Sequence, residues 1–483
     1  MPEPIRYRQI RISKEDNEER LYSLVQDYLR DPELASSVTQ ISLRYPVNRD
    51  SYGCFYNEDG LVQVKAEESV REVSTDPALV EAVKGLDVGD KMNDWLRTLT
   101  WMSPDLVAAR SEREKDWRAP SWYPRQRAIF SNCAAVILLT LCPNIERIIL
   151  EEDYYTTSLF EGVLLKNNHG LLPQKHLQKL RHVKFLPMTD MILGDERYHV
   201  SMSYMRLLRM FNRLPLLEDV SVDAITEDNN GPELLPPHTS NIKTLHIGHT
   251  DMSSMNLGSI IRVPKALESF TFSIGGRSTT HGGRCIVDLK TLGKALLCHK
   301  ASLHTLDLDC DDYIHGSLAL ANHADEVGGA YEILEQYMDD VRDRWFALDE
   351  KEGSGPLFVR DLANTREYGK TMGSLDDFSA LRHIRIGVKV LLGPDDKPAP
   401  FRLFEALPRN LESLLLRGYK KGKNREHDGQ IDEFLRHVGE FPLLKNINGI
   451  EETVPSAWTV RNPDVDEDQL WTPEEENDGW MEV

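Results

Sequence analysis

The sequence predicts an α/β solenoid, in which short parallel strands alternate with helices and each unit packs only on its neighbours. Two observations support this fold class. A phrase of the form apolar-x-x-apolar-x-apolar recurs along the chain, and an apolar residue followed by proline precedes several of its copies. Recurrence at a spacing of 25 to 37 residues indicates stacked structural units, each too small to bury its apolar face alone.

The clearest copies of the phrase begin at Leu217, Ile242, Leu267 and Leu303, and are therefore 25, 25 and 36 residues apart. Since 40% of the chain is apolar, the phrase alone also arises by chance. The apolar residue and proline that precede the phrase make the pattern specific, as in Leu214-Pro215 and Val263-Pro264. Further copies begin at Tyr7, Val38, Ile145, Leu180, Leu381, Leu411 and Leu444. Wider gaps of 107 and 78 residues predict two insertions, at about residues 44–127 and 313–376.

The first 43 residues predict a strand over residues 5–13, a helix over Glu18–Leu29 and a second strand ending at Leu43. Apolar residues of the helix follow helical spacing, and Asp31-Pro32 ends it because proline disfavours helical geometry in the preceding residue. In the first insertion, short helices are expected over residues 77–86 and 92–99. After it, a nearly all-apolar, buried helix is expected over residues 128–141, leading into the strand at Ile145.

Later linkers predict helices that bury one apolar face against the strands, over residues 200–211, 287–297, 400–407 and 431–438. The second insertion contains a strong helical pattern over residues 325–348. Residues 451–483 hold eleven acidic residues against one arginine, which predicts a disordered acidic tail. Three tryptophans in this tail leave two roles open, docking on a partner or capping the last repeat: Trp458, Trp471 and Trp480.

The opening of the chain resembles fungal F-box and leucine-rich-repeat proteins. The resemblance rests on Tyr7-Arg-Gln-Ile-Arg-Ile12, the helix, Pro32-Glu-Leu-Ala35 and Val38-x-x-Ile41-x-Leu43. It implies a degenerate leucine-rich-repeat domain over residues 1–450, an irregular horseshoe with strands on the concave face and helices on the convex face. The F-box that precedes this region in the family has no counterpart before Tyr7. Other residues replace the asparagine of the standard repeat, at Ile225, Thr250, Gly275 and Asp311, so no asparagine ladder is expected.

The composition of the chain indicates which kind of partner and which cellular compartment to expect. A net charge of -21 and a pI near 5.2 argue against a nucleic-acid partner, because phosphate binding requires clustered Lys and Arg. The longest apolar run, Ala134–Cys142, is far shorter than a membrane span. Six scattered cysteines without a C-x-x-C pair predict reduced, buried thiols, and hence a protein of the cytoplasm, the nucleus or both. We also expect the protein to be a monomer.

No motif for catalysis, metal binding or cofactor binding is complete. The glycine-rich stretch Gly275–Gly283 is followed by Arg284-Cys285 where a phosphate-binding loop requires Lys and Ser or Thr. The acidic group of Asp307, Asp309, Asp311 and Asp312 lacks the spacing of a calcium loop and is interpreted as a solvated strand edge. The histidines form no H-E-x-x-H motif. Residues 417–425 are basic and are interpreted as a charged turn, with a nuclear import patch as the alternative.

The candidate binding residues follow from strand alternation. If the second and third apolar residues of each phrase face the core, the residues beside them face solvent on the concave side. They predict a face that runs basic, acidic, basic: Arg44, Arg147, His182, Lys184, Asp219, Asp223, His246, Asp307, Asp309, His383, Arg385 and Arg417. The alternative is that these are ordinary solvated strand residues.

We therefore expect a non-enzymatic scaffold that binds a protein partner. The resemblance implies an alternative, the substrate-recognition subunit of a cullin-type ubiquitin ligase, which would bind a Skp-type adaptor only through a supplied F-box.

Overall fold

A computed structural model describes the following parts of the chain: residues 7–12, 18–43, 76–100, 123–151, 158–186, 200–202, 204–223, 225–227, 235–252, 254–275, 287, 289–311, 314, 371–393, 401–456 and 480–482. The chain divides into two units. The first contains Met1–Leu193, Arg206–Val220 and Pro473–Val483, and the second contains Gly194–Met205 and Ser221–Thr472. Both are α/β units with parallel strands that follow one another largely in chain order, as the coarse fold class predicts.

The sheet of the first unit is parallel throughout its described pairs. Its strands are hydrogen-bonded in the order β14 (Trp480–Glu482), β1 (Gln9–Ile12), β2 (Gln40–Leu43), β3 (Arg147–Glu151) and β4 (His182–Leu186). The register aligns the second apolar residue of successive phrases, pairing Ile10 with Ile41, Ile41 with Ile148 and Ile148 with Val183. Strand β6 (Asp219–Asp223) begins in this unit.

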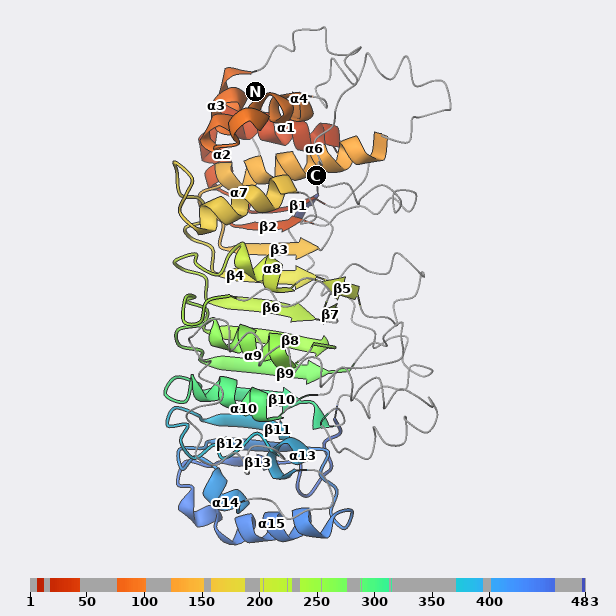
Figure 1. Cartoon of the computed structure of the whole chain (residues 1–483), viewed down its shortest axis with the longest axis vertical. Helices are drawn as coiled ribbons and strands as arrows, with labels where there is room; N and C mark the ends of the chain where they lie inside the picture. The colour runs from red at the N-terminus through yellow and green to blue at the C-terminus, as the bar shows by residue number, and fades with distance from the viewer. Residues whose placement is uncertain are drawn as a thin grey trace, which may run out of the picture. The chain divides into compact units, whose positions relative to one another are not determined.

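The helices of the first unit are α1 (Glu18–Arg30), α2 (Pro32–Ser36), α3 (Pro77–Gly85), η3 (Gly89–Lys91), α4 (Met92–Thr100), α6 (Tyr123–Leu141) and α7 (Ser158–Asn168). The predicted helices over residues 18–29, 77–86 and 92–99 are confirmed within a residue or two. Helix α6 contacts α1, α2, α4 and α7, and every residue from Cys133 to Leu139 is buried. Its all-round apolar surface is thus explained by neighbours on several sides, which Figure 1 shows.

The sheet of the second unit has the order β8 (Thr244–Thr250), β9 (Ser269–Ile274), β10 (Thr305–Asp309), β11 (His383–Gly387), β12 (Ser413–Arg417) and β13 (Asn446–Asn448), with parallel pairing throughout. A separate parallel pair joins β5 (Val200–Met202) to β7 (Ile225–Glu227). The register again aligns equivalent phrase positions, so that Phe270, Leu306 and Ile384 lie side by side.

The helices that accompany this sheet are α9 (Ser254–Arg262), α10 (Leu289–Leu297), α13 (Val388–Leu392), α14 (Leu403–Ala406), α15 (Arg425–Arg436) and η6 (Val438–Glu440), while α8 (Tyr204–Arg209) crosses the boundary between the units in the sequence. Helices α9 and α10 contact each other and lie over one face of the neighbouring strands in Figure 1. Residues 418–424 connect β12 to α15, at the place of the predicted charged turn.

Strand alternation is confirmed by burial. In β10 and β11 the second and third apolar residues of the phrase, Leu306, Leu308, Ile384 and Ile386, are fully buried, and the residues between them are less buried. The same alternation holds in β9 and β12. The phrase therefore fixes which face of each strand turns to the core.

Two predictions differ from the structure. Residues 200–211 form strand β5 followed by the six-residue helix α8, because Val200–Met202 pairs with β7. The acidic tail is ordered at both of its ends. Val454 pairs with Arg417, and Trp480–Glu482 forms β14 beside β1, so the prediction of a wholly disordered tail is wrong for these residues. Residues 457–479 and the helical pattern over 325–348 lie outside the described residues.

No helix in the described ranges is long and apolar enough to cross a membrane.

Candidate interaction face

The sheet of the second unit has a face that carries polar residues in rows. We call it the outward face, and it bears the side chains that alternate with the buried core residues. The parallel register places equivalent residues next to one another in three rows. The first row contains Thr244, Ser269, Thr305, His383 and Ser413. The second row contains His246, Thr271, Asp307, Arg385 and Leu415. The third row contains Ser273, Asp309, Gly387 and Arg417.

A charged cluster crosses three strands of this face. Arg417 of β12 donates from Nη1 to Asp307 Oδ1 of β10 at 2.6 Å, and its Nε lies 3.5 Å from Asp309 Oδ2. The side chains of Arg417, Asp307 and Asp309 are only 16%, 14% and 12% exposed. Because charges this far from water are costly unless paired, the contacts with Arg417 stabilise both carboxylates. Its single charge balances one of them, and Arg385, 3.6 Å from Asp307, is the second cation of the cluster.

Gly387 of β11 lies beside Arg417 in the third row. Arg417 reaches from β12 to β10 across β11, a distance of two strand spacings or about 9.6 Å. The residue of β11 in that row is Gly387, which has no side chain to block the path. The space above Gly387 also holds the carboxylate of Asp311, with which a Cβ at this position would clash.

Asp311 has a structural role that the sequence did not reveal. It is buried, and its two carboxylate oxygens accept hydrogen bonds from the backbone N–H groups of Lys389 at 3.0 Å and Val390 at 2.9 Å. Helix α13 begins after Gly387, which has no side chain with which to cap it. Asp311 therefore supplies the N-terminal cap of α13 from another strand-loop unit.

A second polar cluster surrounds His249. This histidine has a left-handed backbone with φ of 46°, at the irregularity in the pairing of β8 with β9. Its ring Nδ1 lies 2.8 Å from Asp223 Oδ1, and its backbone N–H donates to Ser273 Oγ at 2.8 Å. Gly248 is needed here because a Cβ would meet both the Asp223 carboxylate and the ring of His246. Sequence analysis missed His249, because strict alternation does not place it on this face.

Arg385 and His383 are the well-exposed basic groups of β11. The Arg385 side chain is 61% exposed, and its Nη1 lies 3.6 Å from Asp307 Oδ2. The ring Nδ1 of His383 is 2.9 Å from Ser413 Oγ. His246, in the same row as Arg385, is also exposed.

The predicted acidic middle of the face is wrong as a description of its exposed surface. Asp223 and Asp309 are buried, with 8% and 9% of the residue exposed, and Asp307 is turned toward arginine. The error arose because alternation gives the side of the sheet but not the partner that a side chain finds there. Arg417 is likewise tied into the cluster instead of facing solvent.

In the first unit the predicted residues lie at less regular positions. His182 is exposed, whereas Arg147, Lys184 and Asp219 are half-buried. Two residues at alternating positions, Ser42 and Ile149, are buried although neither lies at a core position of the phrase. Arg44 lies outside the described residues, as do Asp312 and nearly all of the glycine-rich stretch 275–283. The regular polar rows are therefore a property of the second unit.

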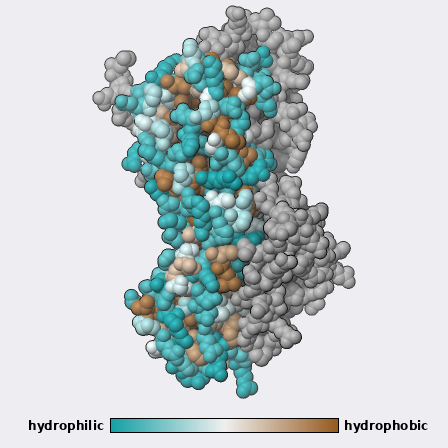
Figure 2. All heavy atoms as spheres, turned by 60° about the vertical axis from the view of Figure 1, so that its left-hand side comes forward, coloured by the Kyte–Doolittle hydropathy of each residue, from teal (hydrophilic) through white to brown (hydrophobic). Residues whose placement is uncertain are grey.

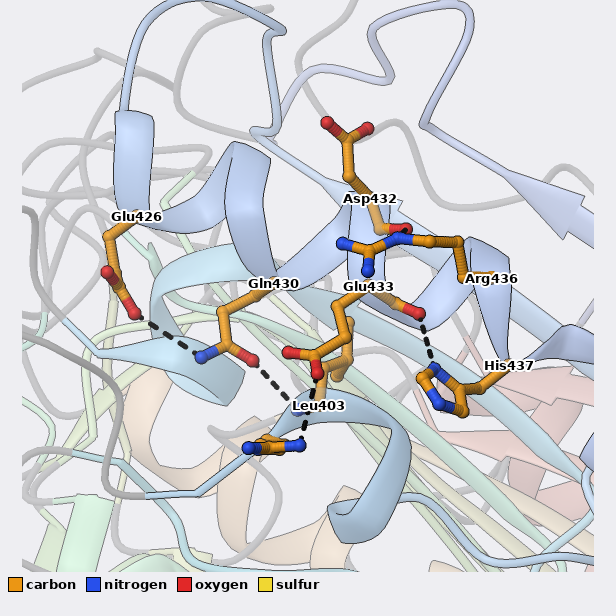
Figure 3. A network of polar contacts seen from close by, with 8 residues as sticks. Leu403, Glu426, Gln430, Asp432, Glu433, Arg436 and His437 are labelled. Carbon is orange, nitrogen blue, oxygen red and sulfur yellow. Dashed lines mark hydrogen bonds and ion pairs between the residues drawn. The ribbon is translucent and has the colours of Figure 1, made fainter.

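The helical side of the second unit is held by a different network, drawn in Figure 3. Gln430 of α15 accepts from the backbone N–H of Leu403 at 3.0 Å, and Glu433 pairs with Arg402 at 3.2 Å. These contacts fasten α15 to α14. Over the surface seen in Figure 2, hydrophilic residues predominate and hydrophobic residues form small groups.

Among the described residues, no group of three or more His, Cys, Asp or Glu side chains is arranged to hold a metal ion. Comparisons with protein-family models, with curated proteins and with solved structures gave no match for this chain.

Proposed function

We propose that the chain is an irregular leucine-rich-repeat solenoid, similar to those of fungal F-box proteins, and that it is a non-enzymatic scaffold for a protein partner. The partner binds the outward face of the second unit. The observation that carries this proposal is the parallel register, which aligns hydroxyl groups and the His383 imidazole in one row and places the Arg385 guanidinium in the next. Such polar groups on rigid strands fix the orientation of a protein partner through hydrogen bonds.

The contacts within the polar clusters favour a scaffold over an enzyme. Asp307 and Asp309 are paired with Arg417, and Asp223 with His249. Ser273 Oγ accepts the backbone N–H of His249, so its described contact is with the main chain and not with the imidazole ring. A serine nucleophile requires hydrogen bonding to the ring nitrogen of a base that a third group orients. Outside these clusters Ser413 Oγ lies 2.9 Å from His383 Nδ1, and this exposed pair has no third group among its described contacts to orient the imidazole. These clusters therefore support the strands and hold the exposed groups in place.

Site-specific cross-linking tests this proposal. A photoreactive amino acid would replace His246 or His383, which are exposed on the outward face, and in a matched control Arg436, which is exposed on α15. We expect one protein partner to be cross-linked from both outward positions and not from position 436. Cross-links from position 436 alone would contradict the proposal.

We also propose that the protein is located in a reducing compartment, the cytoplasm or the nucleus. Cys133 and Cys142 are buried free thiols, and burial raises the pKa of both well above the usual value. Thiols of this kind have a packing role and form no disulfide.

The alternative function is substrate recognition in a cullin-type ubiquitin ligase. It is favoured by the order β1-α1-α2-β2 over residues 9–43, which carries the motifs of the family resemblance. Co-purification of the chain with a Skp-type adaptor would support this alternative. Failure to bind the adaptor, both alone and with an F-box fused before Met1, would exclude it.

A further inference from the structure

On the outward face of the second unit, most of the charged side chains are shielded from solvent. Along strands β9 to β12 the rows contain two aspartates and two arginines, yet three of these four side chains are at most 16% exposed. Arg385 is the exception at 61%. A protein partner approaching this part of the face therefore meets a cation, although the whole chain carries a net charge of -21.

Arg385 retains most of its capacity to bind an anion. The guanidinium has five N–H donors, and the contact with Asp307 involves one nitrogen at 3.6 Å, longer than a hydrogen bond. Asp307 already accepts a shorter hydrogen bond from Arg417 at 2.6 Å. Asp307 thus positions the Arg385 side chain through one long contact, and the guanidinium, 61% exposed, keeps N–H donors in solvent that suit a carboxylate in bidentate geometry.

The surroundings of Arg385 suit an extended peptide. His383 and Arg385 alternate along β11, so their side chains leave the same face about 6.6 Å apart. Carboxylates on alternate residues of an extended peptide have the same separation. Ser413 and Leu415 lie beside them on β12, and Thr305 on β10, which adds hydroxyl groups and one half-buried apolar side chain.

We propose that this β11 patch, made of Thr305, His383, Arg385, Ser413 and Leu415, binds an extended acidic segment of the partner, with Arg385 pairing one of its carboxylates. The inference rests on the proposed scaffold function and specifies the chemistry of the partner. The single arginine of this patch suits a short carboxylate-bearing peptide and not a nucleic acid, which requires several clustered cations.

Fluorescence anisotropy with the full chain tests the proposal directly. The probe is a fluorescein-labelled peptide of five Glu-Thr repeats, and the reference probe has Gln in place of Glu. We expect the Glu peptide to bind at least about tenfold more tightly, and increasing NaCl to reduce the difference. Arg385→Gln should weaken binding of the Glu peptide about tenfold or more and leave the Gln peptide unaffected.

Arg402→Gln is the matched control. Arg402 is 59% exposed, also pairs with a carboxylate, that of Glu433, and lies at the start of α14 in the helical network of Figure 3. Arg402→Gln makes the same change in net charge as Arg385→Gln. Because Arg402 is not part of the β11 patch, the substitution should leave binding of the Glu peptide unchanged. Unaltered melting temperatures for Arg385→Gln and Arg402→Gln would show that both variants are folded.

The proposal is overturned if the wild-type chain binds the Glu and Gln peptides equally, or if the two arginine variants lose equal affinity. These peptide-binding results can be distinguished from results that contradict the scaffold function. If cross-links from positions 246 and 383 persist while the Glu peptide does not bind, the scaffold proposal stands and the acidic partner does not. If the cross-links are confined to position 436, the face itself is wrong.

Discussion

Replacing Arg417 by alanine tests whether the charged cluster of the outward face stabilises the second unit. The substitution leaves Asp307 and Asp309 without their cation, with side chains only 14% and 12% exposed. Removing one partner of a fully buried ion pair costs about 3–5 kcal/mol, and slight exposure lowers this to about 3 kcal/mol. For a unit of this size, that corresponds to a fall of about 6–12 °C in melting temperature. Differential scanning calorimetry and urea denaturation would measure both quantities.

Arg402→Ala provides the comparison for that measurement, because its partner Glu433 lies at 3.2 Å in an ion pair that is mostly exposed on the arginine side. Such pairs contribute about 0–1 kcal/mol. A double-mutant cycle of Arg417→Ala with Asp307→Asn should give a coupling energy above about 1 kcal/mol. If Arg417→Ala costs no more than Arg402→Ala, the cluster does not stabilise the sheet. Reversal of Asp307 and Asp309 to lysine should accordingly unfold the unit, instead of only slowing association with a partner.

Three further predictions concern stability. Leu306→Asp should cost at least about 3 kcal/mol in urea denaturation, because it places an unpaired charge in the core, and a near-neutral result would contradict the strand register. Asp311→Ala should cost about 2–3 kcal/mol by leaving two backbone N–H groups of α13 without an acceptor, and Asp311→Asn should restore part of the loss. His299 is buried, with Nε2 bound to Ile261 O at 2.6 Å, and burial lowers its pKa from 6.5. The unfolded chain therefore binds a proton that the folded chain does not, so stability should fall as pH drops below about 6.5, and His299→Gln should reduce that slope in melting curves.

The sequence alone was sufficient to predict those strands and helices that depend on patterns among neighbouring residues. The recurring phrase identified the strands from β1 to β12 that carry it and the face that each turns to the core, because alternation depends only on neighbouring residues. Helix α1 was located from its apolar spacing, and Asp31-Pro32 marked its end because Asp31 caps α2 and Pro32 opens it. Helices α3 and α4 followed from the same kind of periodicity.

Only the tertiary structure decided the exposed chemistry of the outward face. Arg417 meets Asp307 across 110 residues of sequence, and the contact depends on the register of three strands. Asp311 caps α13 from 78 residues away, and β14 pairs with β1 from the other end of the chain. Periodicity states which side of a strand a residue occupies, but burial and charge pairing depend on long-range neighbours. For that reason the sequence determined the strands of this protein, and the fold determined that Arg385, and not the aspartates beside it, is exposed to a partner.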